Sequence, residues 1–321
     1  MENQQFDVRE NKYIEEVKLL LNDRRIDANT IGQKLYIACY FGYTGVVKLL
    51  LNERINVNNG DTFGQTPFYI ACLFEHIEIV RLLLNDDWTE INKPNRTGQT
   101  PFFVACLKSH IEIVKLLLND QRVDVNQVEN SIGATPFFIA CSKRHVAIVK
   151  LLLNDERINI NKGDIFDQTP LYIACQNGRM EIVKLLLNDE RVDVNKINKN
   201  GATPFWIAYQ EGRIEVVKVL LNDNRVDINQ SIEEGRTPFV VACEKGHIEM
   251  VKHLLASGRE LKGNNVIEIA KENKRVDIVE LLESFQKDPN NTRFILRMQL
   301  SFGGKYLFYF ILFYFIFHSL N

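Results

Sequence analysis

The sequence predicts an all-α solenoid of stacked helix-turn-helix units with hairpin-like loops, and three observations lead to this fold class. Six cysteines recur with successive spacings of 33, 34, 35, 34 and 68 residues, and 68 is twice 34. A Thr-Pro pair lies in the same register before five of them, and a second apolar segment follows each such unit. A constant period of this length is typical of a repeat array. The cysteines are Cys39, Cys72, Cys106, Cys141, Cys175 and Cys243.

Each unit is predicted to begin with a short buried helix. The threonine supplies an N-cap oxygen, and proline fits the first helical position because that N–H has no partner within the helix. Tyr209 replaces the cysteine in the unit that lacks it, so we expect the cysteines to be buried structural thiols rather than disulfide partners or metal ligands. The segments are TPFYIAC (66–72), TPFFVAC (100–106), TPFFIAC (135–141), TPLYIAC (169–175), TPFWIAY (203–209) and TPFVVAC (237–243).

A second helix is predicted after a short polar turn. Its apolar residues cover most of its circumference, which suits a helix packed between neighbours, and Glu with Lys or Arg three residues later forms an exposed stripe. We expect the asparagine of the LLLND segments to end this helix in the left-handed conformation. The segments are HIEIVRLLLND (76–86), HIEIVKLLLND (110–120), HVAIVKLLLND (145–155), RMEIVKLLLND (179–189), RIEVVKVLLND (213–223) and HIEMVKHLLAS (247–257).

The connections between units, such as RVDVNKINKNGAT (191–203), predict a hairpin-like loop with a short strand-like segment and a polar turn containing glycine. The ends of the array depart from the repeat, as terminal repeats must because one face meets water. Residues 13–23 predict a second helix preceded by a truncated first one, and residues 264–285 predict a helix pair without Thr-Pro. We therefore expect eight helix pairs plus an N-terminal partial unit.

The expected domain organisation is one array over residues 1–285 followed by an atypical tail over 286–321. Within the array, a partial repeat covers about 1–29, internal repeats about 30–257, and a capping repeat about 258–285. The tail contains YLFYFILFYFIF (306–317), a run of 12 uncharged apolar residues of which eight are aromatic. Three interpretations remain open for it: a short membrane anchor, an accidental extension of the reading frame, or an apolar clasp docked on the array. As a helix it would span about 18 Å, which is short of the hydrocarbon core of a bilayer.

Composition and motifs argue against several functions. Lys and Arg number 39 against 41 Asp and Glu, so the chain lacks the basic surplus expected of a nucleic-acid-binding protein. The N-terminal sequence has no apolar segment of the signal-peptide type, so we expect a cytoplasmic protein. Motifs for phosphate, dinucleotide, zinc or nucleophile sites are absent, so we expect no enzyme activity, no cofactor and no metal. His76, His110, His145 and His247 open the second helix in one register, which indicates a structural position.

The Thr-Pro-aromatic start, the alanine in the first helix, the His-x-Glu-Ile-Val-Lys-x-Leu-Leu segment and the Asp-Val-Asn before the loop resemble the ankyrin repeat over about residues 5–285. This resemblance implies a curved solenoid whose concave helix-one face and loop tips bind other proteins. Ankyrin repeats usually carry a histidine after Thr-Pro-Leu, and this histidine braces the neighbouring loop by hydrogen bonds. They also often have a Gly-Ala-Asp turn, where this chain has NDERVD. We therefore expect aromatic packing to supply more of the bracing. The residues at the position of that histidine are Tyr69, Phe103, Phe138, Tyr172, Trp206 and Val240.

Residues that differ between units at one fixed register are the candidates for partner recognition, because packing positions must repeat. Two sets stand out, one at the end of each first helix and one at the loop tips. Loop tips begin at Asp61, Asn95, Glu129, Asp164, Asn198 and Ile232. We predict a monomeric scaffold or adaptor that binds a partner protein through these surfaces. The alternative prediction is a scaffold tethered to a membrane by the C-terminal segment 306–317. The predicted contact residues are Phe63, Leu73, Phe74, Arg96, Leu107, Lys108, Ser142, Lys143, Phe166, Gln176, Asn177, Gln210, Glu211, Glu244 and Lys245.

Overall fold

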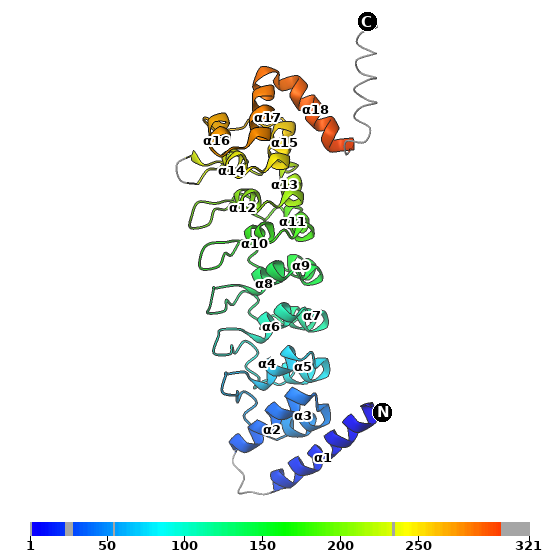
Figure 1. Ribbon diagram of the computed structural model, residues 1–321. Coiled ribbons are helices and arrows are strands. Elements are labelled where there is room, and N and C mark those ends of the chain that lie inside the picture. Colours follow the sequence, from blue (N-terminus) through cyan, green and yellow to red (C-terminus); the bar gives the residue numbers. More distant parts are fainter. Residues whose placement is uncertain (1, 23–27, 54, 233–234, 303–321) are drawn as a thin grey trace. The chain divides into compact units, whose positions relative to one another are not determined.

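The computed structural model describes residues 2–22, 28–53, 55–232 and 235–302 (Figure 1). Within these ranges the chain forms helices and no strand, in agreement with the predicted all-α fold. The chain divides into two compact units, residues 1–170 and residues 171–321, which we describe separately.

The first unit is a stack of four helix pairs that follows a single N-terminal helix. First helices α2, α4, α6 and α8 contact one another in one row, and second helices α3, α5, α7 and α9 form another (Figure 1). The bounds are α1 (Glu2–Asn22), α2 (Ala28–Phe41), α3 (Thr44–Leu51), α4 (Pro67–Leu73), α5 (Ile77–Leu84), α6 (Pro101–Lys108), α7 (Ile111–Leu118), α8 (Pro136–Lys143) and α9 (Val146–Leu153).

The second unit repeats this arrangement and adds one helix after the last pair. Here α12, α14 and α16 lie in one row, while α11, α13, α15 and α17 lie in the other, and α18 packs on α15 and α17. The bounds are α10 (Pro170–Gln176), α11 (Met180–Leu187), α12 (Pro204–Gln210), α13 (Ile214–Leu221), α14 (Pro238–Lys245), α15 (Ile248–Ser257), α16 (Val266–Glu272), α17 (Val276–Lys287) and α18 (Pro289–Phe302). The described residues of the two units thus contain the eight predicted helix pairs.

The Thr-Pro prediction for the first helices is confirmed in detail. Thr66 Oγ1 accepts a hydrogen bond from Tyr69 N at 3.1 Å, and Thr100 Oγ1 accepts one from Phe103 N at 3.0 Å. The apolar residues that follow are buried, with Phe68 and Phe102 almost wholly removed from solvent. The cap therefore starts the helix where its large side chains can enter the core.

All six cysteines are buried and free of disulfides, as predicted. Burial raises the pKa of every one of these thiols, because the apolar surroundings disfavour the thiolate. Since the thiolate is the reactive and metal-binding form, these side chains act as small core hydrophobes.

The second helices end differently from the prediction. Asn85, Asn119 and Asn154 have φ angles of −84°, −72° and −80°, so they stay right-handed rather than left-handed. The chain continues into one more turn there, in which Asp120 N donates to Leu117 O at 3.2 Å. Left-handed residues occur instead at the end of first helices, for example Ser109 with φ 64° and Arg144 with φ 67°.

The loops also differ from the expected strand-like form. The alternating pattern of RVDVN-type segments reflects two buried side chains beneath consecutive turns, as at Val123 and Val125, and not a strand. The alternation of apolar and polar residues in these short segments therefore reflects burial of every second side chain and does not indicate a strand.

The two ends of the array depart from the sequence-based picture. Residues 2–22 form one continuous helix, not a truncated pair, because no proline or glycine interrupts this helix-favouring stretch. At the other end, α17 extends past the predicted boundary at residue 285, and α18 lies wholly beyond it. Arg293 Nε donates to Leu255 O at 3.3 Å and Arg297 Nε donates to Ala256 O at 2.7 Å, while Leu296 is buried.

Residues 306–317, on which the three interpretations of the tail depend, lie outside the described residues. Among the helices in the described ranges, none combines the length and the apolar character needed to cross a membrane.

Candidate functional site

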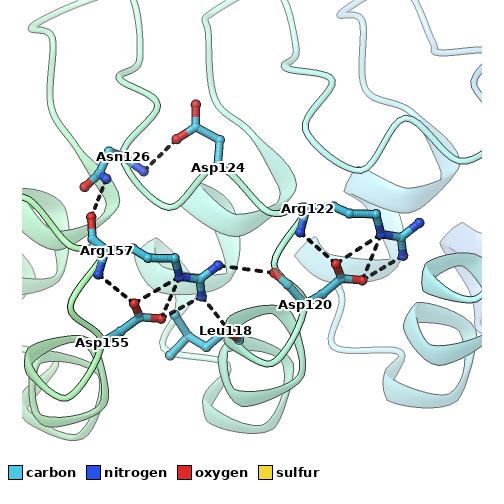
Figure 2. A network of polar contacts seen from close by, with 7 residues as sticks. All are labelled: Leu118, Asp120, Arg122, Asp124, Asn126, Asp155 and Arg157. Carbon is cyan, nitrogen blue, oxygen red and sulfur yellow. Dashed lines mark hydrogen bonds and ion pairs between the residues drawn. The ribbon is translucent and has the colours of Figure 1, made fainter.

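A repeated Asp-x-Arg clamp joins neighbouring repeats at the end of the second helices (Figure 2). Arg157 is held by Asp155 through Nε–Oδ1 and Nη2–Oδ2 contacts of 3.0 and 2.6 Å. Its guanidinium also donates to the carbonyls of Leu118 at 2.7 Å and Asp120 at 3.3 Å, in the preceding repeat. A cation placed on the last carbonyls of a helix is favourable both as a hydrogen-bond donor and towards the helix dipole.

The same clamp recurs in both units. Arg122 Nη2 donates to Leu84 O at 2.6 Å, and Arg225 Nη2 donates to Leu187 O at 2.5 Å, each with its own aspartate two residues earlier. This clamp is what the NDERVD segment supplies in place of a Gly-Ala-Asp turn. The repeats are thus tied together by charged side chains at positions that also repeat in sequence.

A row of asparagines, one in each of several repeats, forms a second set of bonds that holds the loops of adjacent repeats together. Asn126 Nδ2 donates to Arg157 O at 2.7 Å, and Asn126 Oδ1 accepts from Asn159 N at 2.8 Å. Asn58, Asn92, Asn195 and Asn229 each make the same pair of bonds to the following repeat. One amide thereby satisfies both a carbonyl and an N–H of the neighbouring loop, which fixes their register.

The histidines at the start of the second helices have the predicted structural role. Nε2 of His76, His110 and His145 donates to the carbonyls of Tyr40, Leu73 and Leu107 at 3.2, 3.0 and 2.9 Å. The bond persists at two of the arginines that replace histidine, since Arg213 Nε donates to Gln176 O at 2.8 Å and Arg275 Nε donates to Glu244 O at 3.1 Å. At the same register, Nε of Arg179 is buried without a hydrogen-bond partner among the described residues. Each bond caps the end of the first helix in the preceding repeat.

The aromatic residues that replace the usual bracing histidine do more than pack. Tyr69 Oη donates to Gln99 Oε1 and accepts from Asn95 Nδ2, both at 3.2 Å. Trp206 Nε1 donates to Arg236 O at 3.1 Å. The expectation that packing takes over the bracing is therefore corrected at these positions, where the polar tip of the ring still bonds the next loop.

In five of the six variable loops the first residue is an anchor that holds the backbone of its own loop. Asp61 Oδ1 accepts from the N–H groups of Phe63 and Gln65, both at 2.9 Å. Asn95, Glu129, Asp164 and Asn198 serve the same purpose and are buried.

Glu129 shows how the side chain is matched to the loop. Its loop is one residue longer, and the longer glutamate reaches Ala134 N at 3.1 Å, five residues on, where Asp61 reaches four. Burial raises the pKa of Glu129, but hydrogen bonds from Ser131 and from three backbone N–H groups outweigh it, and the pKa is lowered. Variability at this position thus follows loop length.

The predicted contact residues fall on two separate surfaces in the first unit. The helix-one edge consists of the ends of α2, α4, α6 and α8 with the residue that follows each, and it carries Leu73, Phe74, Leu107, Lys108, Ser142 and Lys143. The loop tips carry Phe63, Arg96 and Phe166, with Phe63 and Phe166 66% and 52% exposed. Phe63 and Phe74 lie at opposite ends of α4, a helix of about 10 Å, so the two surfaces are distinct.

The loop tips are joined to one another by single backbone hydrogen bonds. Arg96 N donates to Phe63 O, Asn130 N to Thr97 O, and Ile165 N to Ile132 O, each at 2.8 Å. Phe63 and Arg96 are therefore neighbours, as the sequence prediction requires if both contact one partner.

In the second unit the equivalent positions at the ends of α10, α12 and α14 are polar. They carry Gln176, Asn177, Gln210, Glu211, Glu244 and Lys245, and Glu244 is paired with Arg236. No exposed aromatic residue lies at these positions. The aromatic candidates are confined to the first unit.

Two residues on the helix-one edge, Tyr40 and Phe41, escaped the sequence analysis because their repeat lacks Thr-Pro. They follow Cys39 as Phe74 follows Cys72, and that shared register is the signal that identifies them. Tyr40, Phe41 and Phe74 are 44%, 51% and 43% exposed, although the ring of Tyr40 contacts those of Phe41 and Phe74 at centroid distances of 5.0 and 4.8 Å. They form one exposed aromatic patch from two adjacent repeats.

Trp88 was also missed, and it occupies a clamp position without a guanidinium. It follows Asp86 in the Asp-x-Arg register, is 79% exposed, and keeps only the backbone role in which its carbonyl accepts from Asn58 Nδ2 at 2.7 Å. We expect Trp88→Arg to reach Leu51 O at the end of α3 and to stabilise the protein by about 1 kcal/mol. Urea denaturation followed by circular dichroism measures this; an equal gain from Trp88→Lys, which lacks the planar fork, would contradict the clamp explanation.

The clamps also predict acid sensitivity. The hydrogen bond from the paired arginine lowers the pKa of Asp120, Asp155, Asp189 and Asp223. A lowered pKa stabilises the fold above the unfolded-state value of about 3.9, and this contribution disappears as the pH falls below it through the folded pKa.

A double variant Asp155→Asn and Asp189→Asn is accordingly expected to be less stable at pH 7 and to lose less stability than wild type between pH 5 and pH 3. Glu156→Gln with Glu190→Gln, at the exposed middle positions of the same clamps, is the matched control. Urea midpoints measured across this pH range give the dependence of stability on pH. A dependence as shallow in the control as in the double variant would refute the assignment.

Within the described ranges, no group of three or more His, Cys, Asp or Glu side chains is arranged to hold a metal ion. The repeated polar residues act on neighbouring backbone groups, and the residues left for recognition are those on the helix-one edge and the loop tips.

Comparison with known sequences agrees with this architecture. A family model described as "Ankyrin repeats (3 copies)" matches residues 7–95, 86–164, 156–232 and 224–293, which together cover most of the chain. A search of curated proteins gave no match. The described structure shows the recurring helix pairs within the matched residues, and the chain belongs to the ankyrin-repeat family.

Proposed function

We propose that the protein is a non-enzymatic, cytoplasmic scaffold or adaptor that binds a partner protein through its helix-one edge and loop tips. Ankyrin repeats are in general protein-interaction modules. The observation that carries the proposal is the contrast between the two kinds of position in each repeat. Residues bonded to a neighbouring repeat recur, whereas Phe74, Lys108 and Lys143 differ at one register and are exposed.

The exposed aromatic side chains give this surface its capacity to bind. Tyr40, Phe41, Phe74, Phe63 and Phe166 would each lose apolar area to a partner, and aromatic anchors contribute disproportionately to protein interfaces. Five later repeats carry a polar residue where Phe74 stands, so neither folding nor capping requires an aromatic ring there; these residues are Lys108, Lys143, Asn177, Glu211 and Lys245.

The experiment compares proteins captured by the full-length wild type with those captured by two variants. Tyr40→Ser with Phe74→Ser removes two of the three rings of the helix-one patch, one from each repeat, and Phe63→Ser with Phe166→Ser removes the loop-tip rings. Leu19→Ser with Val8→Ser, two exposed apolar residues of α1, is the matched control. We expect partners to be lost with one or both test variants and kept with the control; an unchanged partner set in both, with the fold intact, would refute the proposed site.

A further inference from the structure

We infer that the helix-one edge of the first unit binds an extended protein segment with an apolar side chain and acidic residues about three and six positions away from it. This inference rests on the proposed function and specifies the class of partner. Aromatic side chains at one end of the edge are followed by basic side chains at the other.

One half of the edge is apolar. Tyr40 and Phe41 end α2, and Phe74 follows α4 as its C-cap, with Tyr40 in ring contact with both other residues. Phe41 also stacks on Tyr43 at a centroid distance of 5.6 Å. These rings support one another but remain about half exposed, so a single apolar side chain laid across them would bury area from two repeats at once.

The other half of the edge is basic. Lys108 ends α6, Lys143 ends α8, and Arg144 follows as the C-cap of α8, and all three are exposed. No ion pair joins any of them to another residue in the described part of the chain. The acidic residue of this edge, Glu75, lies beside His110, with Oε2 3.2 Å from Nδ1.

The spacing of the repeats sets the spacing in the ligand. Packed helices lie about 8 to 10 Å apart, and an extended chain advances about 3.3 Å per residue. A step from Phe74 to Lys108 therefore corresponds to about three residues, and a step to Lys143 and Arg144 to about six. Acidic side chains at those positions would meet cations that have no partner within the described protein.

The edge is also held in place before binding. His76, His110 and His145 donate to the carbonyls of Tyr40, Leu73 and Leu107, which fixes the backbone at the ends of three consecutive first helices. A surface that is already ordered loses little entropy on binding. Three cations beside an aromatic patch suit a short acidic peptide better than a nucleic acid, which needs a longer basic track.

Selection of random twelve-residue peptides displayed on phage, with the full-length protein as bait, tests the inference. We expect the enriched peptides to share an apolar or aromatic residue and Asp or Glu about three and six positions from it. The enriched peptides are then synthesised with a fluorescent label, and their affinities are measured by anisotropy. Failure to enrich any peptide, enrichment without acidic residues, or tighter binding of a single-stranded RNA oligonucleotide would overturn the inference.

Charge variants separate the edge from general electrostatics. Lys108→Glu with Lys143→Glu is expected to weaken the selected peptides about tenfold, and a peptide with Lys in place of its acidic residues is expected to regain affinity for this variant. Lys48→Glu with Lys150→Glu, on the second helices, changes net charge equally and is expected to leave affinity within about twofold. Lys108→Gln with Lys143→Gln provides the test if glutamate at the helix ends impairs folding.

The outcomes distinguish this inference from the proposed function. Partner capture that depends on Tyr40 and Phe74 but not on Lys108 and Lys143 would refute the acidic partner class and leave the scaffold proposal standing. Capture that depends on neither the aromatic nor the loop-tip residues would refute both.

Discussion

Replacing Tyr209 by cysteine, the residue that other repeats carry at this position, is expected to destabilise the second unit by about 3 kcal/mol. Tyr209 is fully buried, its ring lies 4.8 Å from that of Phe205 between centroids, and its hydroxyl donates to Met250 O at 3.5 Å. Cysteine would leave a cavity, since the packed neighbours can close it only in part. Urea or thermal denaturation followed by circular dichroism measures the loss.

The control is Tyr209→Phe, which keeps the ring and removes only the long hydrogen bond to Met250 O. We expect it to cost less than about 1 kcal/mol. A change toward the repeat consensus ordinarily stabilises a protein, so a loss at residue 209 would run against that trend. A Tyr209→Cys protein as stable as wild type would mean that the helices around residue 209 collapse freely onto the smaller side chain.

Replacing Asn126 by aspartate is expected to cost about 2 to 3 kcal/mol in the first unit. The asparagine donates to Arg157 O and accepts from Asn159 N, so it bridges the backbone of two adjacent loops. Aspartate keeps the acceptor but sets an oxygen against the Arg157 carbonyl, which leaves that carbonyl unsatisfied and repelled. Hydrogen exchange of the Asn159 amide, together with urea denaturation, measures the effect.

Asn130→Asp is the matched control for that substitution. Asn130 is an exposed loop asparagine of the same repeat, and its side chain makes a single long bond of 3.5 Å to Arg96 O. We expect a change of less than about 0.5 kcal/mol there. Equal losses at both sites would show that added negative charge, and not the lost bridge, destabilises the loops.

The local features of the fold could be predicted because their physical causes lie within a few residues. Thr66 caps a helix whose first residue is Pro67, and both are adjacent in sequence. Asn119 was misassigned to the left-handed region for the opposite reason. Its conformation depends on Asp120 continuing the turn and holding Arg122, which in turn reaches the carbonyl of Leu84.

The candidate site could be predicted only in part. Variation at a fixed register selected Phe74, Lys108 and Lys143 as candidates, because packing positions repeat along the array. It missed Tyr40 and Phe41, whose repeat lacks the Thr-Pro marker. It also included Asn95 and Glu129, which vary because loop length and loop anchoring vary, and which are buried.

The sequence by itself determined the all-α repeat architecture, the register of its helix pairs and the burial of its cysteines, since the period and the helix caps are local properties of the chain. Only the tertiary structure decided what the repeated polar residues do and which variable residues meet. The partner of Arg157 at Leu118 lies 39 residues earlier in the chain, and the rings of Tyr40 and Phe74 come from different repeats. Contacts at such separations follow from how repeats stack, which local sequence patterns do not encode.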